Sequence, residues 1–187
     1  MAGDQPRRAD AVRNRRLALD ATKTLLAQRE ATITVEAIAR QAGLGAATVV
    51  RAFGNKEALV DAAVADLLDP FIQRARDTLS EPDPEQALRA LLLDLIEFQS
   101  AHWIIGEQLR GLTVPLTTAR RAVLRQTLDD LVAWARENGV VRDDIDATVV
   151  AMLLGEVSYA IARSDEASPR LTESFITVIM DGLRPHQ

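Results

Sequence analysis

The spacing of apolar residues along this 187-residue chain is helical almost throughout. In residues 9–30 they recur every three or four positions, as on one face of an amphipathic helix: Val12, Leu17, Ala18, Ala21, Leu25 and Leu26. The same spacing predicts further long helices at 85–100, 116–138, 147–163 and 169–183. No segment shows the convincing alternation of a strand, so we expect an all-α fold.

Between residues 34 and 52 the pattern predicts two short helices joined by a sharp turn. Thr34 is a good N-cap for the first helix, and Gly43 ends it. The second helix spans roughly 46–52. Asn55 can then cap a longer helix that runs from 56 to about 69 or beyond, and Pro70 would kink or end that helix.

The turn lies in the stretch "GLGAATVVRAFGNK", residues 43–56, which has two possible interpretations. Its first six residues read G-x-G-x-x-T, close to the glycine-rich loop that holds the phosphates of a dinucleotide. Such a loop follows a buried strand and needs a third glycine. Here the preceding segment is helical and the third glycine is missing, and no G-K-[ST] indicates a P-loop. These features disfavour a cofactor loop.

A helix-turn-helix fits the same stretch better. Ala39 is small enough for two helices to cross closely, and Gly43 accepts the left-handed backbone of a tight turn. Gly45 can cap the second helix at little cost relative to serine. Val49 and Phe53 lie four residues apart and face a core, so the other side of this helix is left for a partner.

Composition narrows the candidate chemistry. The chain has no cysteine, which excludes disulfides and thiolate chemistry, and its two histidines make a histidine-rich metal site impossible. We find no nucleophile–base pair and no cofactor motif, so we expect neither an enzyme nor a bound cofactor or metal. The first 60 residues hold ten Arg or Lys and six Asp or Glu, whereas the remaining 127 hold twelve and 21. A basic front on an acidic body suggests that only the front meets a polyanion.

The segment "TVEAIARQAGLGAATVVRAFGNKEALVDA" resembles the DNA-binding part of the TetR family of bacterial transcriptional regulators. The residues that carry the resemblance are Thr34, Ile38, Ala39, Ala42, Gly43, Thr48, Phe53, Lys56, Glu57 and Leu59. The resemblance implies a homodimer that binds a double-stranded palindromic operator and is released by a small-molecule effector. It also implies two domains: residues 1–62 as a helix-turn-helix module with a basic arm, and residues 63–187 as a helical sensing and dimerisation domain.

The resemblance also implies which residues meet DNA. Arg51 is the main polar candidate, for contact with guanine or with a phosphate, and Arg7, Arg8, Arg13, Arg15 or Arg16 can bind the backbone. The family usually carries a serine at Gly45, a polar residue near Ala46 and a tyrosine at Val50, so three polar contacts are absent here. The expected DNA-contacting residues are Thr34, Gly45, Ala46, Ala47, Thr48, Val50, Arg51 and Lys56.

The body supplies candidates for an effector pocket and for a dimer interface. An apolar pocket with a few polar anchors can be lined by Phe98, Gln99, His102, Trp103, Trp134, Met152, Glu156 and Tyr159. A seam of small residues suits close helix packing, either within one chain or, as the resemblance implies, between two copies: Ala151, Gly155, Ser158 and Ala162.

The sequence therefore predicts a ligand-responsive DNA-binding regulator, with a repressor as the usual form in this family. The alternative is a degenerate helical dimer that binds a ligand or a protein without binding DNA, because the usual tyrosine is replaced by Val50. No apolar run reaches the length of about 18–20 residues that spans a bilayer, and the arginines of the N-terminus are followed by no apolar stretch. We therefore expect a cytoplasmic protein without membrane association.

Overall fold

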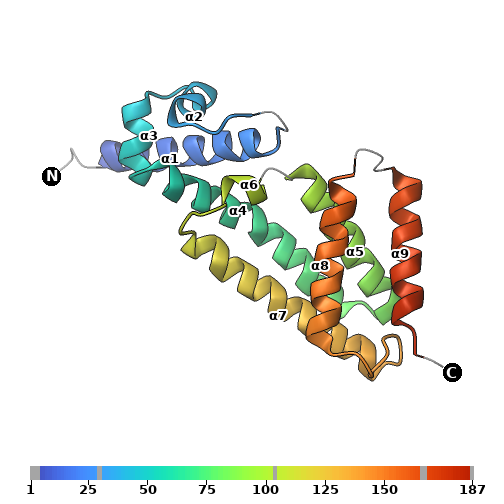
Figure 1. Ribbon diagram of the computed structural model, residues 1–187. Coiled ribbons are helices and arrows are strands. Elements are labelled where there is room, and N and C mark those ends of the chain that lie inside the picture. The colour runs from blue at the N-terminus through green and yellow to red at the C-terminus, as the bar shows by residue number, and fades with distance from the viewer. Residues whose placement is uncertain (1–4, 29–30, 103–104, 165–167, 186–187) are drawn as a thin grey trace. The chain divides into compact units, whose positions relative to one another are not determined.

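The computed structural model describes residues 5–28, 31–102, 105–164 and 168–185, and every regular element within these ranges is a helix (Figure 1). The all-α prediction is therefore confirmed. The elements are α1 Gln5–Leu26, α2 Val35–Ala42, α3 Ala46–Phe53, α4 Lys56–Asp77, the 3₁₀ turn η1 Thr78–Ser80, α5 Pro84–Ala101, α6 Ile105–Gln108, α7 Pro115–Glu137, α8 Ala147–Ala162 and α9 Pro169–Leu183.

The capping signals in the sequence explain where the later helices begin. Asp83 accepts from the backbone N–H of Glu85 at 2.9 Å, and Pro84 occupies the first turn of α5. Asp146 caps α8 and Ser168 caps α9 in the same way. The hydrogen bond that the N–H of Thr148 donates to Asp146 also holds the pKa of this carboxyl below its usual value.

Pro70 does not end the helix in which it lies. α4 continues through it to Asp77, although proline has no N–H to donate to the preceding turn. The helix is therefore longer than the minimum length that the sequence predicted.

The chain forms two compact units whose borders differ from the expected 62/63 boundary. One unit comprises Met1–Leu68 and Ile104–Ala119, and the other comprises Asp69–Trp103 and Arg120–Gln187. The division at Leu68–Asp69 falls inside α4. The segment that begins α7 thus belongs with the N-terminal helices.

In the N-terminal unit, α1, α2 and α3 pack against one another. Their apolar faces point inward because each helix repeats apolar residues at helical spacing. The side chains that become fully buried include Ala18, Leu26, Ile38, Val49 and Leu59.

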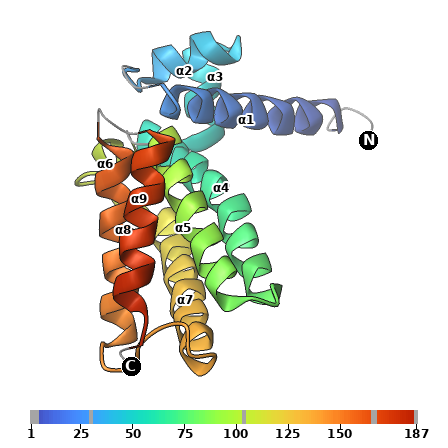
Figure 2. The ribbon, with the colours of Figure 1, turned by 90° about the vertical axis from the view of Figure 1, so that its right-hand side faces the viewer.

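In the second unit, α5 packs against both α8 and α9, and α8 and α9 run alongside it in both ribbon views (Figures 1 and 2). One continuous core joins these helices with α7 and the second half of α4. Its fully buried members include Phe71, Leu88, Leu92, Leu131, Leu154 and Ile176.

None of the helices in the described ranges combines the length and the apolar character that a bilayer-spanning segment needs. The same residues contain no group of three or more His, Asp or Glu side chains placed to hold a metal ion.

Candidate nucleic-acid interface

The turn between α2 and α3 is built by glycine. Gly43 has φ +66°, and its N–H donates to Arg40 O at 3.3 Å while Leu44 N–H donates to Ala39 O at 2.9 Å. This pair of bonds is a Schellman motif, which satisfies the last carbonyls of α2. At the other end of α2, Thr34 Oγ1 accepts from Ala37 N–H at 3.1 Å. The hydroxyl oxygen of Thr34 is therefore engaged in capping.

Helix α3 is short and lacks a side-chain cap at its start. Gly45 is its N-cap residue, with φ −78°, and no side-chain hydrogen bond is made there. At the other end Gly54, with φ +86°, donates its N–H to Val50 O at 2.7 Å. Glycine is needed at residue 54 because of this positive φ, whereas at residue 45 the backbone suits any amino acid.

We expect Gly45→Ser to stabilise the protein by a few tenths of a kcal/mol, because a serine oxygen would accept from the first turn of α3. The space allows it: the nearest atom to a Cβ added at Gly45 is Thr48 Oγ1 at 3.8 Å. Urea unfolding measures the change. Gly45→Ala, which adds the Cβ without an acceptor, should lower stability. A serine variant no more stable than the alanine variant would contradict the capping argument.

The two faces of α3 differ as the helix-turn-helix interpretation expects. Val49 is 1% exposed and Phe53 is half-buried, whereas Val50 is 43% exposed. Ala47 and Arg51 are exposed as well, and Ala46 and Thr48 are half-buried. The structure thus brings the predicted residues of α3 together on one outward face that is apolar apart from Thr48 and Arg51.

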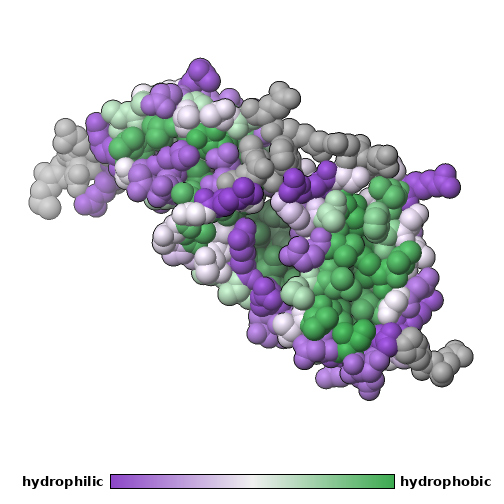
Figure 3. Space-filling view, viewed as in Figure 1, coloured by the Kyte–Doolittle hydropathy of each residue, from purple (hydrophilic) through white to green (hydrophobic). Residues whose placement is uncertain are grey.

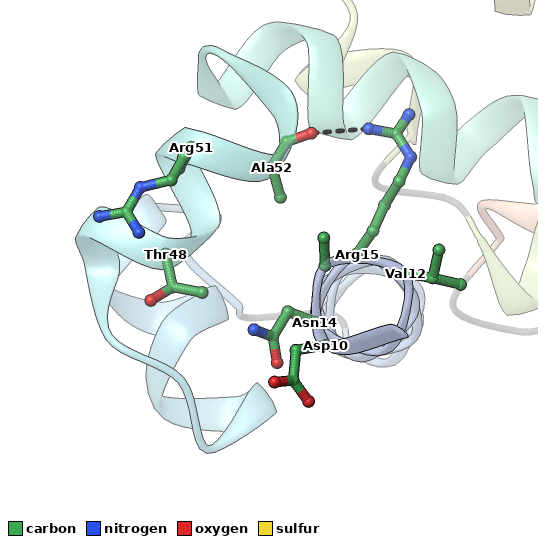
Figure 4. Close-up of a pocket in the computed structure, with 8 residues that line it drawn as sticks. Asp10, Val12, Asn14, Arg15, Thr48, Arg51 and Ala52 are labelled. Carbon is green, nitrogen blue, oxygen red and sulfur yellow. Dashed lines mark hydrogen bonds between the residues drawn. The ribbon is translucent and has the colours of Figure 1, made fainter. Parts of the chain in front are cut away.

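Arg15 has a role that the sequence analysis missed. Its Nη1 donates to Ala52 O at 2.7 Å (Figure 4), and its guanidinium carbon lies 4.0 Å from the centre of the Phe53 ring. The sequence places Arg15 among the arginines expected to bind the DNA backbone. The structure instead joins its guanidinium to the C-terminal end of α3.

A groove of about 650 Å³ lies between α1 and α3. In Figure 4, Asp10 and Asn14 extend from α1 on the side of Thr48, while Arg51 points away from α1. The groove is lined by Asp10, Ala11, Val12, Asn14, Arg15, Thr48, Arg51 and Ala52. The outward face of α3 is therefore bordered by polar groups from α1.

The start of α4 is fixed beside this face. Asn55 Oδ1 accepts from Ala58 N–H at 2.7 Å, which leaves half-buried Lys56 in the first turn. Lys23 of α1 holds α4 through Asp66 Oδ2 at 2.6 Å. Burial alone would lower the pKa of Lys23, but its hydrogen bonds to Asp66 and Asp20 outweigh burial and raise that pKa above its usual value.

A buried carboxylate joins α4 to the start of α7. Asp61 is 3% exposed, and its oxygens accept from Leu116 N–H at 3.0 Å and from Thr117 N–H at 2.8 Å. The Thr117 hydroxyl donates to Asp61 O at 3.3 Å. Asp61 therefore caps α7 from another helix, which is favourable because a helix N-terminus carries positive partial charge.

Two of the predicted effector residues form an aromatic cluster at the end of α5. The Phe98 ring lies 5.1 Å from the Phe71 ring and 4.8 Å from the His102 ring, measured between centroids. Next to them, Gln99 Oε1 is buried and has no hydrogen-bond partner among the described residues. Trp103 lies outside the described residues.

The other predicted effector residues do not all lie next to this aromatic cluster. Trp134 is half-buried against the core, and Tyr159 lies under the guanidinium of Arg163, 5.5 Å from the ring centroid. Met152 is 57% exposed and Glu156 is also exposed. Met152 and Glu156 therefore lie on the outer surface of α8 and do not line an internal pocket.

The small-residue seam of α8 packs inside the chain. Ala151, Ser158 and Ala162 are buried, Gly155 is half-buried, and Ser158 Oγ donates to Leu154 O at 2.6 Å. Ala151, Ser158 and Ala162 are covered within one protomer, where α8 packs on α5, and are therefore not free to meet a second copy. Gly155 is not covered in this way, because a Cβ added there would have no atom within 4 Å.

The exposed apolar surface lies on other positions of α8 and α9. In Figure 3 a continuous hydrophobic area covers the region of these two helices. Its large exposed side chains are Val149, Met152, Leu153, Phe175 and Val178. Contiguous apolar surface of this kind marks a site of association.

Two family models match the chain in complementary regions. Residues 18–63 match the bacterial regulatory proteins of the tetR family, and residues 83–185 match the C-terminal domain of SbtR-like transcriptional regulators. No curated protein sequence matches the chain.

Solved structures resemble the chain over nearly its full length. A TetR transcription regulatory protein from Mycobacterium vanbaalenii is 32% identical, with a TM-score of 0.67 over 95% of this chain and 98% of that one. The TetR transcriptional regulator SCO0520 from Streptomyces coelicolor is 27% identical, with a TM-score of 0.69 over 92% and 99%. FadR from Bacillus subtilis, solved in complex with stearoyl-CoA, is 17% identical, with a TM-score of 0.71 over 90% and 98%, a likeness of fold alone.

Proposed function

The chain belongs to the TetR family of bacterial regulatory proteins, and from this premise we propose that it is a homodimeric repressor released from a palindromic operator by a small molecule. The observation that carries the proposal is the outward face of α3, which is held by a glycine turn at Gly43 and bordered by the groups of α1. A helix presented in this way can enter the major groove of DNA.

The chemistry of this face favours a particular kind of readout. The guanidinium of Arg51 matches the two acceptors of guanine, and Val50 suits the methyl group of thymine. The methyl groups of Ala46 and Ala47 allow close approach of the backbone. Thr48 and Lys56 would contact the DNA backbone. Gly45 and Thr34, at the starts of α3 and α2, would contribute further backbone contacts. So would the arginines of α1 other than Arg15.

Arg51→Ala should weaken binding to the operator by about 1–3 kcal/mol, because a bidentate contact to guanine is lost. The loss of affinity should be confined to operator DNA. The variant should also show a weaker base preference at one position of each half-site. Fluorescence anisotropy on operator duplexes with single base changes measures both. Equal weakening on every sequence would show that Arg51 contacts a phosphate.

The proposed dimer uses the exposed apolar surface of α8 and α9. Two copies related by a two-fold axis would bury the same surface on each protomer. Such an interface needs large apolar side chains at its centre, and Met152, Leu153 and Val178 supply them. The dimer proposal thus keeps α8 but replaces its small seam with its exposed face.

The proposed effector site is at the end of α5. Phe98 and His102 would provide an aromatic surface, and Gln99 Oε1 is an acceptor without a partner among the described residues. A buried acceptor without a partner is costly, so a ligand that donates a hydrogen bond would be favoured. We therefore propose a largely apolar effector with a hydroxyl or amine group, and we retain Trp134 and Tyr159 as further candidates for its lining.

A mobility-shift titration with DNA from upstream of the chain's own gene tests the proposal. We expect a shifted complex whose log affinity falls steeply with log salt concentration, by about 0.9 for each phosphate neutralised. Absence of a complex at low salt would instead favour a helical dimer that binds a ligand or a protein without DNA. The apolar Val50 would be consistent with that alternative.

A further inference from the structure

Helix α3 depends on its neighbours for its position. It has eight residues, and an isolated helix shorter than about 12–15 residues is marginal in water. Its N-terminal end at Gly45 has no side-chain cap. On the inner face, Val49 anchors the middle of the helix in the core. Phe53, at the C-terminal end, is only half-buried, so a further contact can help to orient that end.

Arg15 supplies this contact through two interactions with the last two residues of α3. Its guanidinium donates to Ala52 O at 2.7 Å, and a cation is favourable there because the C-terminus of a helix carries negative partial charge. The same group lies 4.0 Å from the Phe53 ring centroid, at a cation–π distance. A planar guanidinium makes both contacts at once, which the ammonium group of lysine does not.

These contacts lie directly next to the proposed reading residues. Arg51 precedes Ala52 in the chain, and Thr48 lies one helical turn before it. A change in tilt at the C-terminal end of α3 moves both side chains relative to a bound duplex. Displacements of about 1 Å at a functional site are enough to reduce its performance strongly.

We propose that Arg15 is a positioning residue for DNA recognition: it holds the C-terminal end of α3 against α1, so that Arg51 and Thr48 face the DNA at a fixed angle. The inference rests on the proposed function, and it removes Arg15 from the set of phosphate contacts. Its neighbour Arg16 offers a matched contrast. The side chain of Arg16 is 84% exposed and pairs with Asp20 of its own helix.

The first test measures DNA affinity against salt concentration for Arg15→Ala, Arg15→Lys and Arg16→Ala, each in the full-length protein. The DNA probes are the operator recovered by selection and an unrelated duplex of equal length. Arg15→Ala should lose about tenfold in operator affinity with an unchanged salt slope, and its affinity for the unrelated duplex should stay the same. Arg15→Lys, which keeps the charge, should recover part of the loss.

Two outcomes of this test overturn the proposal. If Arg15→Ala weakens both duplexes equally and lowers the salt slope by about 0.9, Arg15 is a phosphate contact. If Arg15→Ala binds the operator as tightly as the wild-type protein does, Arg15 has no role in recognition.

The second test needs no DNA. Amide hydrogen exchange in the free protein should be faster at the C-terminal half of α3 in Arg15→Ala, while exchange in α5 stays as in wild type. Arg16→Ala should leave both helices unchanged. Unchanged exchange of α3 in Arg15→Ala would refute the positioning role. If the wild-type chain selects no DNA, the repressor proposal fails, and this exchange result still decides whether Arg15 holds α3.

Discussion

We expect Val178→Glu to convert the proposed dimer to a monomer. Val178 is 70% exposed in the single chain and lies on the apolar surface of α8 and α9. In an interface with two-fold symmetry the substitution occurs twice, so two unpaired carboxylates would have to be buried. We expect the dissociation constant of the dimer to rise at least about 100-fold. Sedimentation velocity across a range of protein concentrations measures this change.

The matched control is Val12→Glu on α1, because Val12 is also 70% exposed but lies outside the proposed interface. This variant should remain a dimer. The Val178→Glu monomer should also lose most of its affinity for a palindromic operator, since each molecule then reaches one half-site. A Val178→Glu protein that sediments as wild type does would show that the apolar surface of α8 and α9 is not the dimer interface.

Asp61→Ala will lower the free energy of unfolding by about 2–5 kcal/mol. The carboxylate of Asp61 is the acceptor for the N–H groups of Leu116 and Thr117 at the start of α7. Thr117 is fully buried, so water cannot replace the acceptor that its N–H loses, whereas Leu116 is 47% exposed. Urea unfolding followed by circular dichroism measures the loss, and hydrogen exchange at residues 116 and 117 shows whether it begins at this cap.

Asp66→Ala provides the comparison for Asp61→Ala, because it removes a carboxylate that pairs with Lys23 on a partly exposed part of the same helix. Such a pair is worth about 0–1 kcal/mol. Asp61→Asn should fall between the two, since the amide keeps one acceptor oxygen. Equal effects of Asp61→Ala and Asp66→Ala would show that the buried cap contributes no more than a surface ion pair.

The parts of the fold that the sequence predicted correctly are those determined by local interactions. Apolar periodicity located the long helices, and Gly43 identified the tight turn because only glycine accepts its backbone conformation without strain. Asp146 and Ser168 cap α8 and α9 through interactions that are local in the same way.

Features that depend on contacts between distant residues were missed. Arg15 lies among other arginines, so the sequence indicates only that it is part of a basic arm. Its contact was missed because its partner Ala52 is 37 residues away. The sequence does not distinguish Asp61 from the other polar residues of its helix, because its partner Thr117 is 56 residues away. No spacing pattern in a single sequence identifies such pairs.

The small-residue seam of α8 shows a different limit of prediction from the sequence. Ala151 and Ser158 share one helical face, and that spacing indicates close packing without specifying the partner. In the structure the partner is α5 of the same chain. Proposing a dimer surface required the exposed fractions of Met152 and Val178, which depend on what the rest of the fold covers.

Selection from a random-sequence duplex library, using the purified full-length protein at physiological salt, tests the central claim most directly. The account predicts an inverted repeat, because the two α3 helices of a symmetric dimer read two equivalent half-sites. It further predicts a preferred guanine in each half-site that Arg51→Ala no longer selects. A library that stays unenriched, or that yields a single site without a repeat, would contradict the account.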